Sequence, residues 1–116
     1  MPTLNLTTNV PAGSVNSSDL LATLSKMVAE ALGKPEKYVL ISVTTEKPMS
    51  FGGTEDPCAY AELISIGKLG LEENKKISAV LSECVSVKLG VPSNRFYIKF
   101  VDVARQDFGW SGGTFA

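Results

Sequence analysis

The chain has 116 residues, enough to bury a core as one domain and too few for several. Hydrophobic residues make up 44% and charged residues 20%, a balance typical of soluble folded proteins and not of disordered ones. The formal net charge is −1 and the basic residues are scattered, which gives no electrostatic case for binding nucleic acid or a membrane surface. The N-terminus lacks the basic and apolar regions of a secretory signal, so we expect a cytoplasmic protein.

Histidine is absent and the only cysteines are Cys58 and Cys84. Histidine-based catalysis and a standard zinc site, which needs three or four nitrogen or sulfur ligands, are therefore excluded. Cys84 falls on the apolar face of a predicted helix, where a small buried side chain is expected. Cys58 has no second cysteine three residues on, so there is no Cys-x-x-Cys redox motif. We expect no metal and no cofactor.

Pro2 is the first candidate for chemistry in chain order. Cytosolic processing removes an initiator methionine when the next residue is small, which would leave Pro2 with a free secondary amine. The residues from Thr3 to Thr8 are typical of a strand, so that amine would lie at a strand end and not on a frayed terminus. A proline in second position is weak evidence by itself, and its importance depends on what surrounds it.

A helix is predicted next, because apolar residues recur at the i, i+3, i+4, i+7 spacing of one buried face. Ser17 and Ser18 are suitable N-caps, Gly33 is a suitable C-terminal cap, and Pro35 prevents continuation of the helix. The apolar positions of this face are Leu20, Leu21, Leu24, Met27, Val28, Ala31 and Leu32. A strand from Tyr38 to Val43 follows.

The second half of the chain repeats the first at an offset of 57 residues. Leu32-Gly33-Lys34-Pro35 matches Leu89-Gly90-Val91-Pro92, and the strand at 38–43 matches one at 95–100. The same offset places the apolar positions of the first helix over those of a second, which carries Ile77, Val80, Leu81, Cys84, Val85 and Leu89. Glycine, proline and apolar positions that agree at a single offset indicate an internal duplication.

An α+β fold follows from this repeat. Residues 1–116 form a single domain of two pseudo-symmetric β-α-β units, about 2–56 and 57–116, and right-handed crossovers make the strands of each unit parallel. Two such units side by side give a four-stranded mixed sheet with both helices on one face. The strands are interpreted as apolar on both sides, and no further helix is available to cover the other face. We therefore expect an obligate oligomer with a large sheet-lined interface.

The same topology brings three distant segments together. Pro2 begins the first strand and Lys34 lies just before the second, at the same edge of the sheet. If the third strand runs against the first, its end at Ser65-Ile66 arrives there as well. A nearby ammonium and apolar walls would lower the pKa of the amine toward neutrality, as proton abstraction requires. Lys34 could also bind a substrate carboxylate, or simply lead from the Gly33 cap into Pro35, and its position does not decide between the two.

These residues resemble the macrophage migration inhibitory factor and D-dopachrome tautomerase family of the tautomerase superfamily, from end to end and with a plant or algal character. The motifs that carry the resemblance are Pro2, Thr8-Asn9-Val10-Pro11, Gly33-Lys34-Pro35, Tyr38, Phe51-Gly52-Gly53, Glu55 to Cys58, Ser65-Ile66-Gly67-Lys68, Arg95, Tyr97-Ile98, Asp102, Gly109-Trp110 and Thr114-Phe115-Ala116. The resemblance implies a homotrimer whose active sites lie between subunits, with Pro2 as the general base in keto–enol tautomerisation of phenylpyruvate-type acids. D-Dopachrome isomerisation is a second reaction that it suggests.

Carried over by position, the resemblance gives each remaining site residue a role. Lys34 and the Ser65-Ile66 segment would bind the substrate, and Tyr97 of the neighbouring chain would donate to its carbonyl or enolate oxygen. The aromatic pocket would be walled by Phe108 and Trp110, together with Tyr38 and Phe115. Trp110 and Phe115 could instead form a C-terminal hairpin that packs on the next subunit, and the two roles are compatible.

Three departures from the family pattern bear on specificity. Lys99 stands where the mammalian factor has a substrate-contacting asparagine, so it either strengthens carboxylate binding and lowers the pKa of Pro2, or crowds the pocket and changes the substrate. Ala61 replaces the second cysteine of a Cys-x-x-Cys motif, which excludes the transfer of a thiol-oxidoreductase activity. Thr3 and Phe108 also differ at the pocket edge.

The leading hypothesis is therefore a phenylpyruvate-type tautomerase that acts on a small aromatic 2-oxo acid. The alternative is a trimer that binds protein or receptor partners and whose pocket is vestigial. It would act either as a cytokine-like protein, released by leaderless secretion, or inside the cell.

Overall fold

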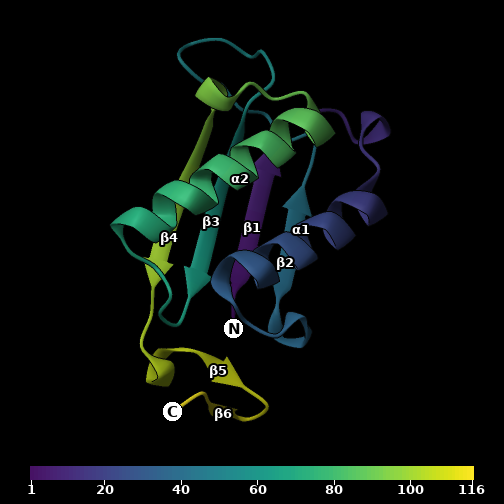
Figure 1. The fold of residues 1–116 in the computed structure, drawn as a ribbon. Helices are drawn as coiled ribbons and strands as arrows, with labels where there is room; N and C mark the ends of the chain where they lie inside the picture. Colours follow the sequence, from purple (N-terminus) through teal and green to yellow (C-terminus); the bar gives the residue numbers. More distant parts are fainter.

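The apolar stripe predicted near residues 17–32 forms a helix that lies across one face of a four-stranded sheet, beside a second helix (Figure 1). The computed structural model describes residues 1–116. The sheet consists of β1 (Thr3–Thr8), β2 (Leu40–Thr44), β3 (Ala59–Ser65) and β4 (Phe96–Asp102), and the helices are α1 (Ser17–Leu32) and α2 (Leu71–Leu89). A two-stranded hairpin of β5 (Gly109–Trp110) and β6 (Gly113–Thr114) ends the chain. The remaining short helical turns are η1 (Ala12–Ser14), η2 (Glu36–Tyr38), η3 (Ser93–Arg95) and η4 (Arg105–Asp107).

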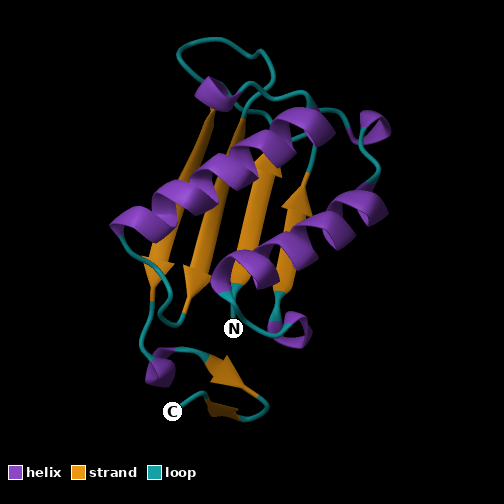
Figure 2. Ribbon diagram, in the orientation of Figure 1, coloured by secondary structure: helices purple, strands orange, loops and turns teal.

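The strand order confirms the two β-α-β units. The sheet has the order β2-β1-β3-β4, with β1 parallel to β2, β3 parallel to β4, and the two central strands antiparallel. Both helices cover the same face, as Figure 2 shows. Because the central strands run in opposite directions, the start of β1 and the ends of β3 and β4 lie at one edge of the sheet, next to the C-terminal hairpin (Figure 1).

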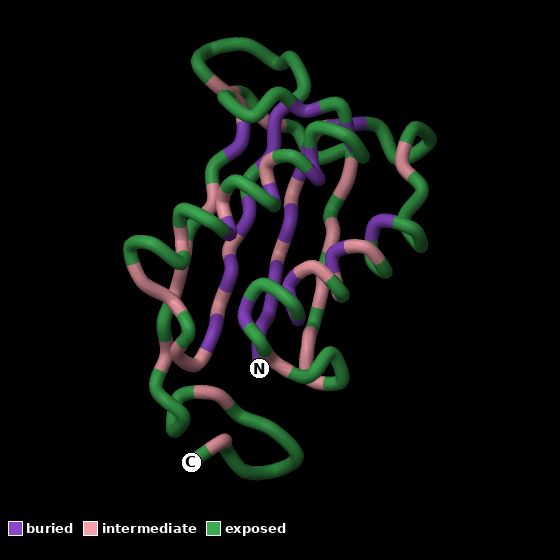
Figure 3. Tube along the Cα trace, viewed as in Figure 1, coloured by how far each residue is buried: buried purple, intermediate pink, exposed green.

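The core lies between the helices and the sheet (Figure 3). Helix residues equivalent at the offset of 57 are buried together: Leu24 and Leu81 are 0% and 2% exposed. They pack on Leu4, Leu6 and Leu63 of the central strands, which are also almost completely buried. Cys84 belongs to this core, as predicted, and burial raises the pKa of its thiol.

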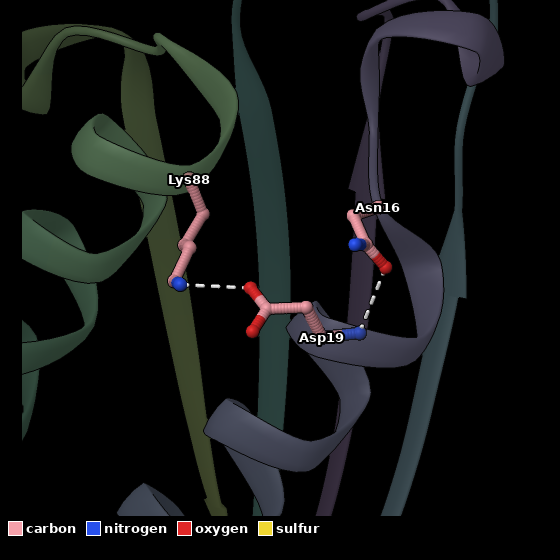
Figure 4. Close-up of polar contacts among 3 residues, drawn as sticks. All are labelled: Asn16, Asp19 and Lys88. Atoms are coloured by element: carbon pink, nitrogen blue, oxygen red, sulfur yellow. Dashed lines mark hydrogen bonds and ion pairs between the residues drawn. The ribbon is translucent and has the colours of Figure 1, made fainter.

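The start of α1 corrects the expected cap. Ser17 and Ser18 are the first two residues of the helix, and Asn16 is the N-cap, with its side-chain Oδ1 accepting a hydrogen bond of 3.1 Å from the Asp19 amide (Figure 4). Asparagine is at least as good a cap as serine, so the conformation of the loop before the helix determines which of the adjacent residues is the cap. At the other end Gly33 is the C-terminal cap in the left-handed region, as predicted.

One ion pair joins the two helices on the outer surface. The Lys88 Nζ of α2 lies 2.7 Å from the Asp19 Oδ2 of α1, near the C-terminus of one helix and the N-terminus of the other (Figure 4). Each charge is also opposite in sign to the partial charge of the helix end at which it lies, which is favourable. Because both side chains are partly exposed, solvent screens the pair and its contribution to stability is small.

The uncovered face of the sheet is more polar than expected. Cross-strand partners on it form a row of Ser42, Asn5, Glu62 and Lys99. A second row is Thr44, Thr7, Tyr60 and Tyr97, and the row nearest the start of β1 is Leu40, Thr3, Ile64 and Val101. The strands were interpreted as apolar on both sides, and on this face apolar residues alternate with polar and charged ones. Neither helix combines the length and the apolarity that crossing a bilayer requires.

Candidate functional site

The start of the chain is buried at the edge of the sheet. Pro2 is among the fully buried residues, and only 9% of Met1 is exposed. The Pro2 carbonyl accepts a hydrogen bond of 3.0 Å from the Leu40 amide, which fixes the chain beside the first residue of β2. Backbone pairing therefore holds Pro2 at a defined position.

Lys34 reaches this position from the end of α1. Gly33, at φ 61°, turns the chain out of the helix, and the Lys34 amide still donates to the Ala29 carbonyl at 3.0 Å. The Lys34 Nζ donates a hydrogen bond of 2.6 Å to the Ile66 carbonyl. The three segments that contain Pro2, Lys34 and Ile66 thus lie at the same edge of the sheet.

The turn after β3 is held by its own hydrogen bonds. The Ser65 Oγ donates to the Gly67 carbonyl at 2.8 Å, and the Gly67 amide donates to the Asp102 Oδ1 at 3.0 Å. Ser65 is 0% exposed, so its hydroxyl shapes the turn from within and does not line the pocket. Asp102, at the end of β4, is the side chain that ties this turn to the neighbouring strand.

The electrostatic environment favours a neutral amine. Burial, and then the nearby Lys34 ammonium, lower the pKa of the amine of Met1 from its ordinary value. The pKa of Lys34 is itself lowered, by burial first and then by the positive charges of Lys68 and Arg105, against which Asp102 acts. Both pKa values are lowered, as expected where several cations lie close together and partly buried at the edge of the sheet.

Aromatic side chains form a pocket beside the start of β1. Trp110 stacks on Phe115, with ring centroids 5.4 Å apart and an interplanar angle of 12°. Tyr38 meets both rings edge-on, at 5.9 Å from Trp110 and 6.3 Å from Phe115, and Phe108 lies 6.1 Å from Phe115. The cavity has a volume of about 300 Å³ and is also lined by Met1, Thr3, Lys37, Val39 and Leu40.

The C-terminal hairpin therefore has contacts within its own chain. Trp110 and Phe115 were also expected as candidates for packing on a neighbouring subunit, and here they contact Tyr38 of the same chain. The Phe115 amide donates to the Phe108 carbonyl at 3.2 Å, which closes the segment on itself. These contacts place the hairpin beside the start of the chain.

Two of the expected site residues lie elsewhere. Tyr97 lies near the start of β4, at the end of the sheet away from Pro2. It is in register with Tyr60 of β3 and, one strand further, with Thr7 of β1. It is 67% exposed and packs on Phe51 with ring centroids 4.8 Å apart. Lys99 points from the uncovered sheet face, in register with Glu62. Within one chain neither residue meets Pro2.

Contacts of Arg95 hold together the segment beside Tyr97. Arg95 donates hydrogen bonds of 2.9 to 3.3 Å to four backbone carbonyls of the segment 51–57, and its guanidinium lies 5.4 Å from the centroid of the Phe51 ring. A cavity of about 360 Å³ opens next to the tyrosine, between Phe51, Tyr60 and Met49. Tyr97 is thus an exposed phenol on a fixed support.

Sequence reasoning missed two residues of the pocket. Lys37 lines it because η2 turns the chain between Pro35 and Val39, and Met1 lines it because the chain start is folded inward. The Pro35-Glu36-Lys37-Tyr38 segment was a usable signal, since a proline that follows a helix cap often begins a short turn. No three Cys, Asp or Glu side chains lie close enough together to hold a metal ion.

These features give the site a defined chemical character. It combines an amine of lowered pKa, a neighbouring ammonium and an apolar aromatic cavity. Such a set can bind an aromatic acid through its carboxylate and move a proton at an adjacent carbon.

Comparison with known proteins gives one family for the whole chain. The family model described as macrophage migration inhibitory factor (MIF) matches residues 1–116. The macrophage migration inhibitory factor of Xenopus tropicalis is 42% identical over 116 residues and covers both chains completely. The homologue from Trichuris trichiura is 42% identical over 115 residues, 99% of this chain and all of the relative.

Solved structures agree with the sequence relatives. The homologue from Prochlorococcus marinus superposes with a TM-score of 0.94 at 40% identity, covering 98% of this chain and 99% of that one. The protein from Trichinella spiralis gives a TM-score of 0.94 at 41% identity, with coverage of 97% and 99%. The chain belongs to the macrophage migration inhibitory factor family, within the tautomerase superfamily.

Proposed function

We propose that the protein is a keto–enol tautomerase for phenylpyruvate-type acids, with the nitrogen of Pro2 as the general base. One observation carries the proposal: the start of the chain is buried beside a lysine whose Nζ lies 2.6 Å from the Ile66 carbonyl. Burial and then the Lys34 ammonium lower the pKa of the Met1 amine at this position. We infer the same direction for the Pro2 nitrogen once Met1 is removed, as a base that works near neutral pH requires. Membership of the tautomerase superfamily supports an isomerase of this kind.

The reaction needs a proton to leave carbon and another to arrive at oxygen. In the keto-to-enol direction, the Pro2 nitrogen removes a proton from C3 of the 2-oxo acid and the electron pair forms the C2–C3 double bond. The C2 oxygen takes a proton from Tyr97 of a neighbouring chain. After the enol leaves, the Pro2 nitrogen gives its proton to water and Tyr97 takes one from water, which restores both groups. The reverse sequence returns the ketone. Lys34 binds the carboxylate and so aligns C3 with the amine.

The rest of the substrate would lie among the aromatic side chains. A phenyl ring fits beside Tyr38, Phe108, Trp110 and Phe115, which already contact one another at ring distances of 5.4 to 6.3 Å. The Ile66 backbone would border the carboxylate end, where its carbonyl orients Lys34. No cofactor takes part in this scheme.

A homotrimer would complete the site. Tyr97 is 67% exposed and lies at the far end of the sheet from the Pro2 of its own chain, so only another subunit can present it to the amine. The uncovered sheet face, with Lys99 on it, gives a surface for such an assembly. We propose that the neighbouring chain contributes both residues to each pocket.

Removal of Met1 is the first expected outcome. Met1 lines the pocket, and its presence keeps the Pro2 nitrogen in a peptide bond, where it has no basic lone pair. Intact-mass spectrometry of the purified protein should give a mass lower than that of the full sequence by one methionine. A chain that keeps Met1 throughout, or is acetylated at Pro2, would contradict Pro2 as a base.

Replacement of the proline should remove most of the activity. Pro2→Gly keeps a free amine but makes it primary and mobile, so kcat for enol-phenylpyruvate should fall by roughly 10²–10⁴-fold, the usual effect of losing a positioned base. Decay of the enol absorbance measures this, and Pro48→Gly, in an exposed loop, is the matched control. Equal activity in Pro2→Gly and wild type would exclude the proline from catalysis.

Removal of the Lys34 charge should change the pH dependence. Lys34 lowers the pKa of the Met1 amine, after burial as the larger cause, and by the same argument lowers that of the Pro2 nitrogen in the mature chain. Lys34→Ala should therefore raise the pKa of Pro2 and move the acid limb of the kcat/KM profile to higher pH. KM should also rise through loss of the carboxylate contact. Lys34→Arg keeps the charge and should keep the acid limb near its wild-type position. An acid limb unmoved in Lys34→Ala would show that the lysine does not act on the base.

Assembly and the shared site can be tested together. Light scattering on a sizing column should give about three times the chain mass, and a monomer at micromolar concentration would contradict the trimer. Pro2→Gly and Tyr97→Phe should each be poorly active alone. Refolding them together should restore activity, because mixed trimers contain pockets with an intact proline from one chain and an intact tyrosine from the next. A lack of restored activity would contradict a site formed by Pro2 of one chain and Tyr97 of the next.

A further inference from the structure

Lys37 is the one charged side chain that lines the aromatic pocket. The other lining residues are apolar or aromatic, apart from Thr3 and Gly109. An ammonium on the wall of a cavity of about 300 Å³ is not required for binding a phenyl ring. The position of Lys37 therefore indicates which substituent the ring of the ligand would carry.

The backbone fixes where Lys37 lies. It is the middle residue of η2, in which the Tyr38 amide donates to the Pro35 carbonyl at 3.2 Å and the Val39 amide donates to the Glu36 carbonyl at 2.9 Å. The Lys37 Nζ lies 5.2 Å from the centroid of the Tyr38 ring, on the aromatic wall itself.

Apart from the Tyr38 ring, the charge of Lys37 has no partner: it forms no ion pair and no hydrogen bond. The ion pairs within 4.0 Å are Lys75–Glu72 and Lys88–Asp19, and Lys37 makes no side-chain hydrogen bond. Glu36 on the same turn forms no ion pair with it. The ammonium is therefore free to bind an anionic group that enters the pocket.

The site then has two separate cations for one ligand. Lys34 lies at the edge beside the chain start, where it would take the carboxylate of a 2-oxo acid, and Lys37 lies on the wall that the ring would contact. Lys68 and Arg105 add positive charge near Lys34. A ligand with a single negative charge neutralises one end of this arrangement and leaves the other unpaired.

We infer that the pocket takes an aromatic 2-oxo acid with a second anionic group, a carboxylate or a phosphate ester, on its ring, and that Lys37 binds that group. The inference rests on the proposed function and adds the substrate class to it. Lys37 is a specificity-determining residue in this scheme and takes no part in the proton transfer.

Unreactive planar probes test this directly. Cinnamate has one negative charge, 4-carboxycinnamate has a second carboxylate, and 4-(phosphonooxy)cinnamate has a phosphate, so the last two distinguish the sources of the second charge. Calorimetric titration of the mature protein should give at least one dianionic probe an affinity about fivefold above that of cinnamate, the upper range for one exposed ion pair. Raising the salt concentration should reduce this preference.

Variants of the lysine provide the controls. Lys37→Gln should reduce the preference to about one and leave cinnamate affinity within about twofold of wild type, because only the second contact is lost. Lys37→Arg should keep the preference, and Lys37→Glu should reverse it. Lys26→Gln, an exposed lysine of α1, should behave as wild type.

The outcomes separate the two proposals. Equal wild-type affinities for all three probes, or a preference that survives in Lys37→Gln, would overturn the role of Lys37 while turnover of enol-phenylpyruvate would still support the tautomerase. A dianion preference that depends on Lys37, in a protein that turns over no enol acid, would support the binding site and contradict the tautomerase.

Discussion

The arrangement of the site depends on the contact between the Lys34 ammonium and the Ile66 carbonyl. The donor follows α1 in the first β-α-β unit and the acceptor follows β3 in the second, so a bond of 2.6 Å joins the two halves at the point where the chain begins. A charged donor makes this hydrogen bond stronger than one between neutral groups. It also holds the positive charge of Lys34 near the amine of Met1. This charge, after burial, is a cause of the lowered pKa of that amine. One contact thus joins the architecture to the chemistry.

The C-terminal segment depends on the same edge of the sheet. Strands β5 and β6 have two residues each, and a hairpin of this size has little stability by itself. The stacked Trp110 and Phe115 rings and their edge-on contacts with Tyr38 hold it beside η2. Aromatic pairs of this geometry each add roughly 0.5–1.5 kcal/mol beyond the area they bury. The pocket wall and the stability of the hairpin therefore come from the same three side chains.

The sequence was most informative where a pattern extended over many residues. The offset of 57 residues and the apolar helix faces predicted both β-α-β units, and Leu24 and Leu81 are buried as equivalent positions. The convergence of the chain start, Lys34 and Ile66 followed from strand direction, because the parallel strands β1 and β2 begin at one edge and the antiparallel strand β3 ends there. Patterns of this kind are redundant, so no single residue decides them.

Features that depend on individual side-chain choices were harder to predict. Asn16 caps α1 in place of Ser17 or Ser18, since all three are good caps and the loop geometry decides. The uncovered face was expected to be apolar, but Asn5, Glu62 and Lys99 form a row across it that depends on register. Lys37 was missed because its place in the pocket depends on a three-residue turn and on a hairpin distant in sequence. Ser65, for which the resemblance implied a substrate contact, is buried in its turn and donates to the Gly67 carbonyl.

The central claim is that the Pro2 nitrogen is a neutral base near physiological pH. Titration of the mature protein labelled with ¹⁵N-proline, followed by NMR at the Pro2 nitrogen, measures its pKa directly. We expect this pKa to be lower in the folded protein than for the same N-terminal proline in an unfolded peptide. Burial and the Lys34 ammonium, which lower the pKa of the Met1 amine at this position, both disfavour the protonated form. A pKa equal to or above that of the peptide would contradict Pro2 as a base, since folding would then give no preference for the neutral nitrogen.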